Sequence, residues 1–140
     1  MYTKAKEAFF LCMIGGALYC CLEIFWSGHT HWTMFVLAAL LTLPLDQMGN
    51  WNTPFWLQSL IGGAVITLSE LISGLILNVW LGLHVWDYSY LPFNFMGQIC
   101  IEYSLIWTVL SGGGIIFFDF LRWKFFKEEM PHYSWRFKHP

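Results

Sequence analysis

The sequence predicts an all-α polytopic membrane protein with four transmembrane helices, and three observations support this fold class. Of the 140 residues, 57% are hydrophobic and only 11% are charged, whereas an ordinary soluble domain carries about 25% charged residues. The chain contains successive long apolar stretches. These stretches are continuous and do not alternate with polar residues, so they favour helices over the strands of a membrane barrel. The length fits one transmembrane domain over residues 1–140.

The first two expected spans cover residues 8–26 and 31–48. The first is interrupted only by Glu23. The apolar part of the second, 32–45, would give about 21 Å of helix, which is shorter than the roughly 30 Å hydrocarbon core of a bilayer. Pro44 favours a kink or an end at this point. We therefore expect a short second helix, with a kinked or partly re-entrant segment as the alternative.

The third and fourth expected spans cover residues 54–80 and 98–121. Pro54 is a residue type suited to the start of a helix, and the third segment is long enough to require tilt or to project beyond the bilayer. The fourth segment is followed by a basic tail over residues 122–140. Trp residues fall near most of the expected span ends, where the bilayer meets water.

The positions of the basic residues predict the orientation in the membrane. Short basic flanks stay on the cytoplasmic side, and this chain has no Lys or Arg between positions 7 and 121. Both termini are therefore expected in the cytoplasm, with loops 27–31 and 84–96 outside and loop 47–53 inside. The tail cluster could bind anionic lipid head groups, and no nucleic-acid partner is expected. The basic residues are Lys4, Lys6, Arg122, Lys124, Lys127, Arg136 and Lys138.

Acidic residues inside the expected spans are the main functional candidates. A carboxylate facing lipid is costly, so such groups face a bundle interior or an aqueous cavity. No Lys or Arg lies in the spans to pair with them, so each must be neutral, bind a cation or use polar neighbours. The alternatives are a structural hydrogen-bonding role and a position at the membrane surface. The candidate polar path comprises Glu23, Thr67, Glu70, Asn78, Gln98 and Glu102.

The expected outer loops carry a second group of polar side chains. If the predicted orientation holds, His29, His31, His84 and Asp87 lie at one membrane face and form a candidate outer mouth. Such a mouth could capture a ligand or tune its entry by His protonation. Loop hydrogen bonding and interfacial anchoring are the alternatives. His and Asp can bind metals, but the H-x-H pattern is weak and we predict no metal site.

The sequence contains no established catalytic motif. G-x-S-x-G, H-E-x-x-H and Walker A patterns are absent, and the cysteines lack zinc-ligand spacing. We therefore expect small-residue packing for Cys12, Cys20, Cys21 and Cys100, no cofactor and no enzymatic activity. An intramembrane hydrolase using the carboxylates and His is the alternative.

Several distinctive segments occur together in this chain: Glu23 with Gly28–Met34, Glu70–Gly74 with Asn78, Trp86–Ser89, Pro92–Asn94 and Gly97–Cys100. Together they resemble one family of small bacterial membrane proteins, the Putative ABC-transporter type IV or CmpB-like family. The similarity spans about residues 10–110. The resemblance implies a multi-pass protein of the bacterial plasma membrane with a permease role, and an ATPase would be a separate subunit.

Two functional hypotheses follow from these observations. The first is a permease-like subunit or small proton- or cation-coupled transporter, which forms homo-oligomers around the acidic polar path. The second is a membrane scaffold that recruits a partner and whose buried acids are structural. Replacement of Glu70 by Gln should be well tolerated under the second hypothesis.

Overall fold

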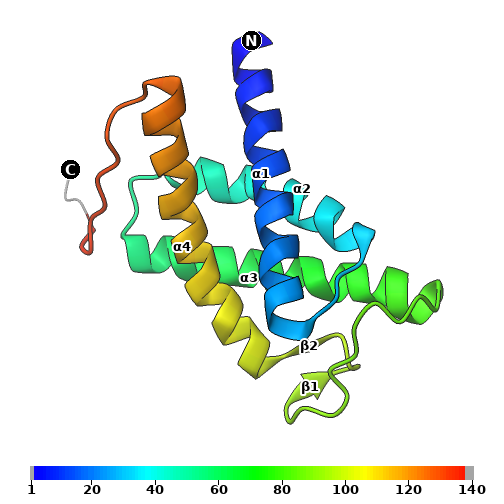
Figure 1. The fold of residues 1–140 in the computed structure, drawn as a ribbon. Helices are drawn as coiled ribbons and strands as arrows, with labels where there is room; N and C mark the ends of the chain where they lie inside the picture. The colour runs from blue at the N-terminus through cyan, green and yellow to red at the C-terminus, as the bar shows by residue number, and fades with distance from the viewer. Residues whose placement is uncertain (1, 138–140) are drawn as a thin grey trace. The chain divides into compact units, whose positions relative to one another are not determined.

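The computed structural model describes residues 2–137 and is built mainly from α-helices (Figure 1). A π-helix extends the third α-helix, and a short antiparallel pair of strands precedes the fourth. In chain order the elements are α1 (Tyr2–Ser27), α2 (Trp32–Met48), α3 (Phe55–Gly74), the π-helix η1 (Leu75–Trp80), β1 (Asn94–Phe95), β2 (Ile99–Cys100) and α4 (Ile101–Phe126).

Among residues 2–137, three helical segments are long and apolar enough to cross a membrane: Lys4–Ser27, Phe55–Trp80 and Ile101–Phe126. Their mean hydropathies are 2.0, 2.0 and 1.6. The remaining helix, α2, has 17 residues and is therefore short, as expected. The predicted helical membrane fold is confirmed.

Local chemistry explains where α2 begins and ends. The His31 ring nitrogen Nδ1 accepts a hydrogen bond from the Thr33 backbone N–H at 3.3 Å, so His31 caps one of the N–H groups that a helix start leaves without a helical partner. Pro44 lies inside the helix, which continues to Met48. The proline therefore does not end this segment.

The fourth helix differs from the expected segment at both ends. It begins at Ile101, whereas the sequence predicted a start at Gln98. Gln98 instead lies in the turn between β1 and β2, where its N–H donates to the Phe95 carbonyl at 3.0 Å. Gly97 precedes it with a φ of 72°, a left-handed conformation that a right-handed helix excludes. The helix also continues past residue 121 to Phe126.

The chain divides into two compact units. Unit 1 contains residues up to Asn52 together with Gly114–His132, so it includes α1, α2 and the second half of α4. Here α1 and α2 pack on each other. Gly15 makes the approach possible, because a Cβ on it would collide with the side chain of Thr42.

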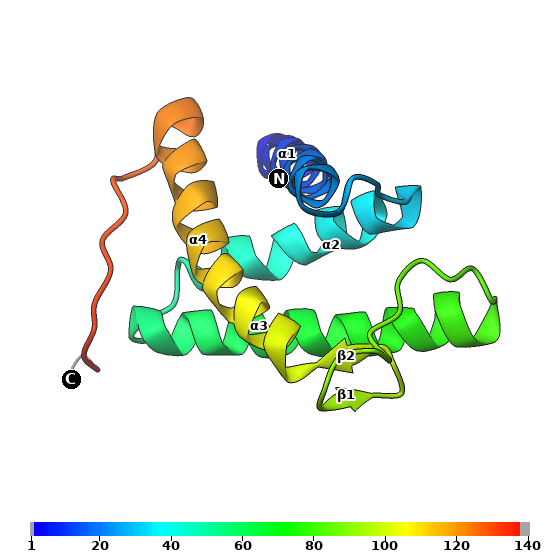
Figure 2. The same cartoon turned by 60° about the horizontal axis from the view of Figure 1, so that its bottom comes forward.

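Unit 2 contains Thr53–Gly113 and the segment from Tyr133 onward, so it includes α3, η1, the strands and the first half of α4. The loop after η1 turns back and enters the strand pair beside α3 (Figures 1 and 2). The helices α3 and α4 are joined by hydroxyl hydrogen bonds. Ser59 Oγ donates to the Thr108 carbonyl at 2.6 Å, and Ser111 Oγ donates to the Ser59 carbonyl at 2.7 Å.

Candidate functional site

Glu70 is a buried carboxylate in α3, with only 4% of its surface exposed. Its Oε1 accepts a hydrogen bond from the Tyr88 hydroxyl at 2.6 Å, and its Oε2 accepts one from Trp107 Nε1–H at 2.9 Å. Tyr88 comes from the loop after η1 and Trp107 from α4. The Tyr88 ring stacks on Tyr103, with ring centroids 4.7 Å apart and planes at 11°. Aromatic side chains from different elements thus surround the carboxylate.

The two donors differ in what they permit at Glu70. An indole N–H can only donate, whereas a phenol hydroxyl can donate or accept. Trp107 therefore keeps Oε2 as an acceptor. A proton on the carboxyl group would lie on Oε1 and point at the Tyr88 oxygen. The site can accordingly hold Glu70 as a carboxylate or as a neutral acid with hydrogen bonds in both states.

A second buried polar group joins η1 to the same loop. Asn78 Nδ2 donates to Gln98 Oε1 at 2.9 Å, and Asn78 Oδ1 accepts from the Val85 N–H at 2.7 Å. The Gln98 carbonyl also accepts from Trp86 Nε1–H at 3.0 Å. Asn78 and Gln98 are 8% and 6% exposed. The amide pair lies at a π-helix, a widened helical turn that recurs at functional sites.

The structure brings part of the predicted polar path together in unit 2. Thr67 donates to Ser104 Oγ at 3.1 Å across α3 and α4, and it lies in the same helix as Glu70. With the amide pair these residues form what we name the Glu70 site: Thr67, Glu70, Asn78, Tyr88, Gln98 and Trp107.

Two predicted path residues lie outside the Glu70 site. Glu102 is exposed in the first turn of α4, where a negative charge is favourable near the positive end of the helix dipole. Glu23 belongs to unit 1. It is half-buried in α1, and its Oε2 accepts a hydrogen bond from Thr30 Oγ1 at 2.9 Å. Burial therefore separates Glu70 from the other two acids of the expected spans.

Three of the four predicted mouth residues, His29, His31 and Asp87, make local contacts. His31 caps α2, and the ring of exposed His29 lies 3.1 Å from the Ser27 carbonyl oxygen. His84 is exposed and has a φ of 50°. Asp87 Oδ1 accepts from the Ser89 N–H at 2.9 Å, and this hydrogen bond lowers the pKa of Asp87. Within residues 2–137 there is no group of three His, Cys, Asp or Glu side chains that could hold a metal ion.

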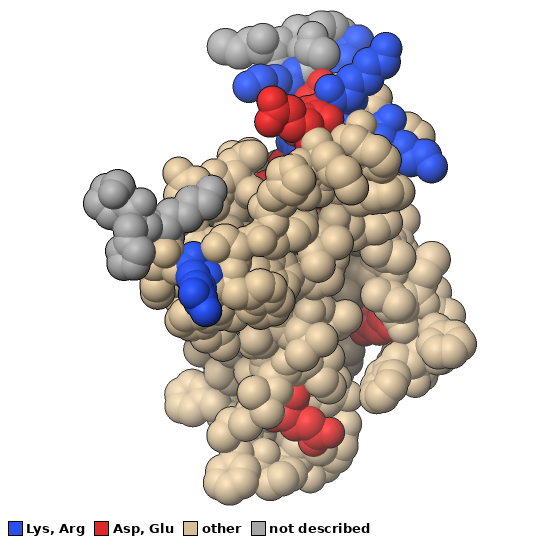
Figure 3. Space-filling model, turned by 90° about the vertical axis from the view of Figure 1, so that its left-hand side faces the viewer, with Lys and Arg blue, Asp and Glu red and all other residues tan. Residues whose placement is uncertain are grey.

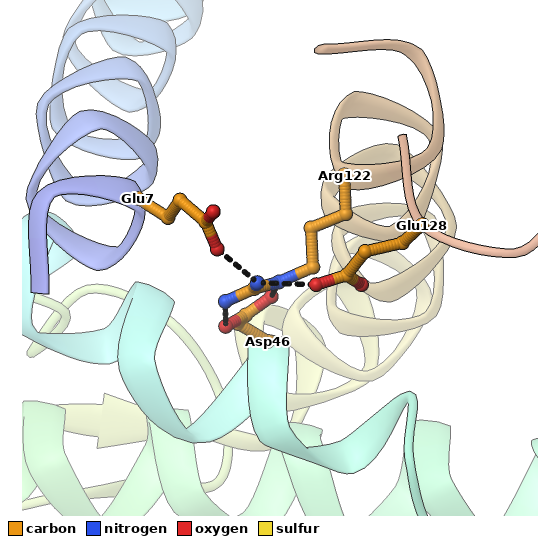
Figure 4. A network of polar contacts seen from close by, with 4 residues as sticks. All are labelled: Glu7, Asp46, Arg122 and Glu128. Atoms are coloured by element: carbon orange, nitrogen blue, oxygen red, sulfur yellow. Dashed lines mark hydrogen bonds and ion pairs between the residues drawn. The ribbon is translucent and has the colours of Figure 1, made fainter. Parts of the chain in front are cut away.

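An ion network in unit 1 was not predicted from the sequence. Arg122 on α4 binds Asp46 on α2 through Nε and Nη2, both at 2.5 Å. Its Nη1 lies 3.4 Å from Glu7 Oε2 on α1 and 3.1 Å from Glu128 Oε1 (Figure 4). Arg122 therefore ties three helices together. Figure 3 shows charged side chains gathered at the end where α1 begins and α4 ends.

The positions of Arg122 and Asp46 in the sequence explain why these ion pairs were not predicted. The sequence predicts a basic tail from residue 122, but Arg122 lies inside α4 and its guanidinium binds carboxylates. Asp46 falls at the end of the expected second span, 31–48, and it is 3% exposed. One sequence feature could have indicated a partner for Asp46. It is an acid at the end of an apolar stretch, and burying a carboxylate without a cation is costly.

The family model described as Putative ABC-transporter type IV matches residues 16–137. The chain belongs to this family. It is thus a membrane protein of a transport-related family, and the resemblance seen in the sequence is confirmed. No curated protein and no solved structure matches the chain.

The region matched by the ABC-transporter type IV family contains the whole Glu70 site. It also contains Asp46, Arg122 and Glu128 of the ion network, whereas Glu7 precedes it. The family assignment supplies the membrane and transport context. The geometry supplies the chemical groups on which a specific role can be proposed.

Proposed function

We propose that this chain is a permease-like membrane subunit in which Glu70 is the proton- or cation-binding group of a polar path. The observation that carries the proposal is the burial of the Glu70 carboxylate between two neutral donors, Tyr88 and Trp107. An acid in this position carries an insertion cost. A glutamine could make comparable hydrogen bonds without a charge, so the presence of an ionisable group at this buried position supports a role that uses its charge or its proton.

The hydrogen bonds at Glu70 suggest how binding would proceed. Oε1 faces the Tyr88 hydroxyl, which can reverse its donor and acceptor roles. A proton, or a cation displacing the hydroxyl, would bind at this oxygen, while Trp107 continues to hold Oε2. Thr67 and the amide of Asn78 would extend the polar path along α3 and η1.

The proposed subunit would act with other chains. The sequence has no nucleotide-binding motif, so coupling to ATP would require a separate ATPase subunit, as the family description suggests. The four helices of one copy are too few to enclose a channel on their own. We therefore propose that copies associate into a homo-oligomer. The basic ends of the chain support a plasma-membrane topology with both termini in the cytoplasm.

The test is proton and monovalent-cation flux in liposomes containing the purified protein. We expect Glu70→Gln to reduce flux at least about tenfold, because Gln imitates the neutral acid but cannot release a proton or balance a cation. Glu102→Gln is the matched control, since it makes the same chemical change at an exposed position. Equal flux in the two variants and in the wild type would defeat the Glu70 mechanism.

The second candidate function is a non-transporting scaffold. It is favoured by the way Glu70 joins α3, the loop and α4 through its two hydrogen bonds, which is also what a structural acid would do. In that case Glu70→Gln would fold and function normally. Glu70→Ala would instead lose stability, because the buried Tyr88 hydroxyl and the half-buried Trp107 N–H would lose their acceptor; a buried donor left without a partner costs about 1–3 kcal/mol.

A further inference from the structure

The segment 81–100, which we name the lid, covers the Glu70 site from one side. It connects η1 to α4 and sends Tyr88 inward to the Glu70 carboxylate. Tyr88 is 9% exposed although it belongs to a loop. The Val85 N–H and the Gln98 side chain bind Asn78 on η1. The lid is therefore attached to the α3–η1 helix by buried polar groups.

A glycine on the helix provides the space into which the lid fits. A Cβ on Gly74 would lie 2.5 Å from Gln98 Oε1, 3.0 Å from Gln98 Cβ and 3.0 Å from Trp86 Cζ2. Gly74 itself has ordinary helical angles, φ −64° and ψ −42°, so the backbone does not require glycine there. The close approach of the lid does require it.

The lid is bonded within itself and has left-handed backbone at several positions. The Tyr88 N–H donates to the Gly97 carbonyl at 2.8 Å, and the Gly97 N–H donates to Asn94 Oδ1 at 3.0 Å. Positive φ values occur at Gly82, His84, Phe93, Met96 and Gly97. For non-glycine residues such angles are costly and persist only where surrounding contacts impose them. The folded form of the lid therefore depends on its contacts, among them those with Asn78 and Glu70.

We propose that the lid controls access to Glu70 and that the Tyr88–Glu70 hydrogen bond is its latch. This inference rests on the proposed function, because it names how the same site is regulated. In the closed form seen here, the Tyr88 hydroxyl occupies the Oε1 side of the carboxylate. Opening removes the Tyr88 hydroxyl from that oxygen, so that a cation or a proton donor can reach it, and releases the Val85 N–H from Asn78. In the closed form, the Tyr88 hydroxyl therefore occupies the position at which the ligand would bind.

Hydrogen exchange of the Val85 amide in lipid nanodiscs measures opening without reference to transport. Gly74→Ala should push Gln98 and Trp86 off the helix and speed this exchange roughly tenfold. The matched control is Gly113→Ala, because a Cβ on Gly113 meets no atom within 4 Å. Tyr88→Phe removes the latch hydroxyl and keeps the ring, and it should also raise exchange about tenfold.

The outcomes separate the lid from the transport proposal. Val85 exchange that is the same in Gly74→Ala, Tyr88→Phe and Gly113→Ala would overturn the lid. Faster exchange in the first two variants, with helix α4 still protected, supports it and excludes general unfolding. If exchange responds in this way while Glu70→Gln leaves flux unchanged, the lid stands and the proposed transport role fails. If Glu70→Gln abolishes flux but Gly74→Ala and Tyr88→Phe leave Val85 exchange unchanged, the transport role stands and the lid proposal fails.

Discussion

Replacing Arg122 by Leu should destabilise unit 1 far more than an ordinary surface substitution does. Asp46 is 3% exposed, and two nitrogens of the Arg122 guanidinium bind its two oxygens in a bidentate pair. Removing the arginine leaves the carboxylate buried without that cation. Breaking a buried ion pair from one side costs about 3–5 kcal/mol, because an uncompensated charge remains. We expect a loss of this size in the free energy of unfolding.

The same network contains an internal comparison. The Glu128 carboxylate lies 3.1 Å from Arg122 but its side chain is 46% exposed, so Glu128→Gln should change stability by only about 0–1 kcal/mol. Asp46→Asn combined with Arg122→Leu should recover part of the loss from Arg122→Leu alone, because the buried charge is then absent. This recovery distinguishes the charge effect from lost packing.

The assay is reversible unfolding in mixed detergent micelles, followed by Trp fluorescence. Lys124→Leu is the matched control on the same helix: Lys124 is exposed, and its Nζ lies 5.8 Å from the Phe120 ring centroid, a contact worth about 0.5–1 kcal/mol. If Arg122→Leu costs no more than Lys124→Leu, the bidentate pair does not stabilise this unit and the reasoning is wrong.

Two further predictions concern unit 2. Gly63→Ala should cost about 1–3 kcal/mol in the same unfolding assay, because a Cβ there would lie 2.7 Å from the Thr108 Cα; an unchanged or increased stability would contradict the tight helix contact. Asp87 should titrate below its ordinary value of 3.8, because its ionised form accepts the Ser89 N–H. This hydrogen bond therefore stabilises the turn fully at pH values above 3.8, the ordinary pKa of Asp, and is lost as the pH falls through the lowered pKa of Asp87. An NMR titration of the Ser89 amide should show a midpoint below 3.8 in the wild type and no such transition in Asp87→Asn. A wild-type midpoint at or above 3.8 would contradict the lowered pKa of Asp87.

The sequence places Glu70 among three candidate acids but does not rank it above Glu23 and Glu102. All three are acids within or beside apolar stretches. Only Glu70 is buried, because the loop residue Tyr88 and the α4 residue Trp107 meet at its carboxylate. These partners are 18 and 37 residues away in the chain, and no local pattern specifies such contacts.

Gln98 lies in a different local structure from the one that the sequence predicts. The expected span 98–121 places it in the same helix as Glu102, but Gln98 precedes α4 and lies in a turn. It nevertheless reaches the buried site, through the lid and the amide of Asn78. The left-handed backbone at Gly97 decided this outcome. Glycine is compatible with both helix and turn in a sequence, so its presence alone did not reveal the turn.

Composition and hydropathy were sufficient for the helical membrane fold and the short α2, because the length and continuity of apolar runs are local properties of the chain. Family-specific segments were sufficient for the transport-related family. Tertiary structure decided which charges are paired and buried. Arg122 meets Asp46 across 76 residues of sequence, and a carboxylate's environment depends on the side chains that converge on it. The same arginine could lie in a solvated basic tail or in a buried ion pair, and its sequence neighbours do not distinguish the two. The fold decides between them, because it sets the desolvation of the carboxylate and the geometry of the contact.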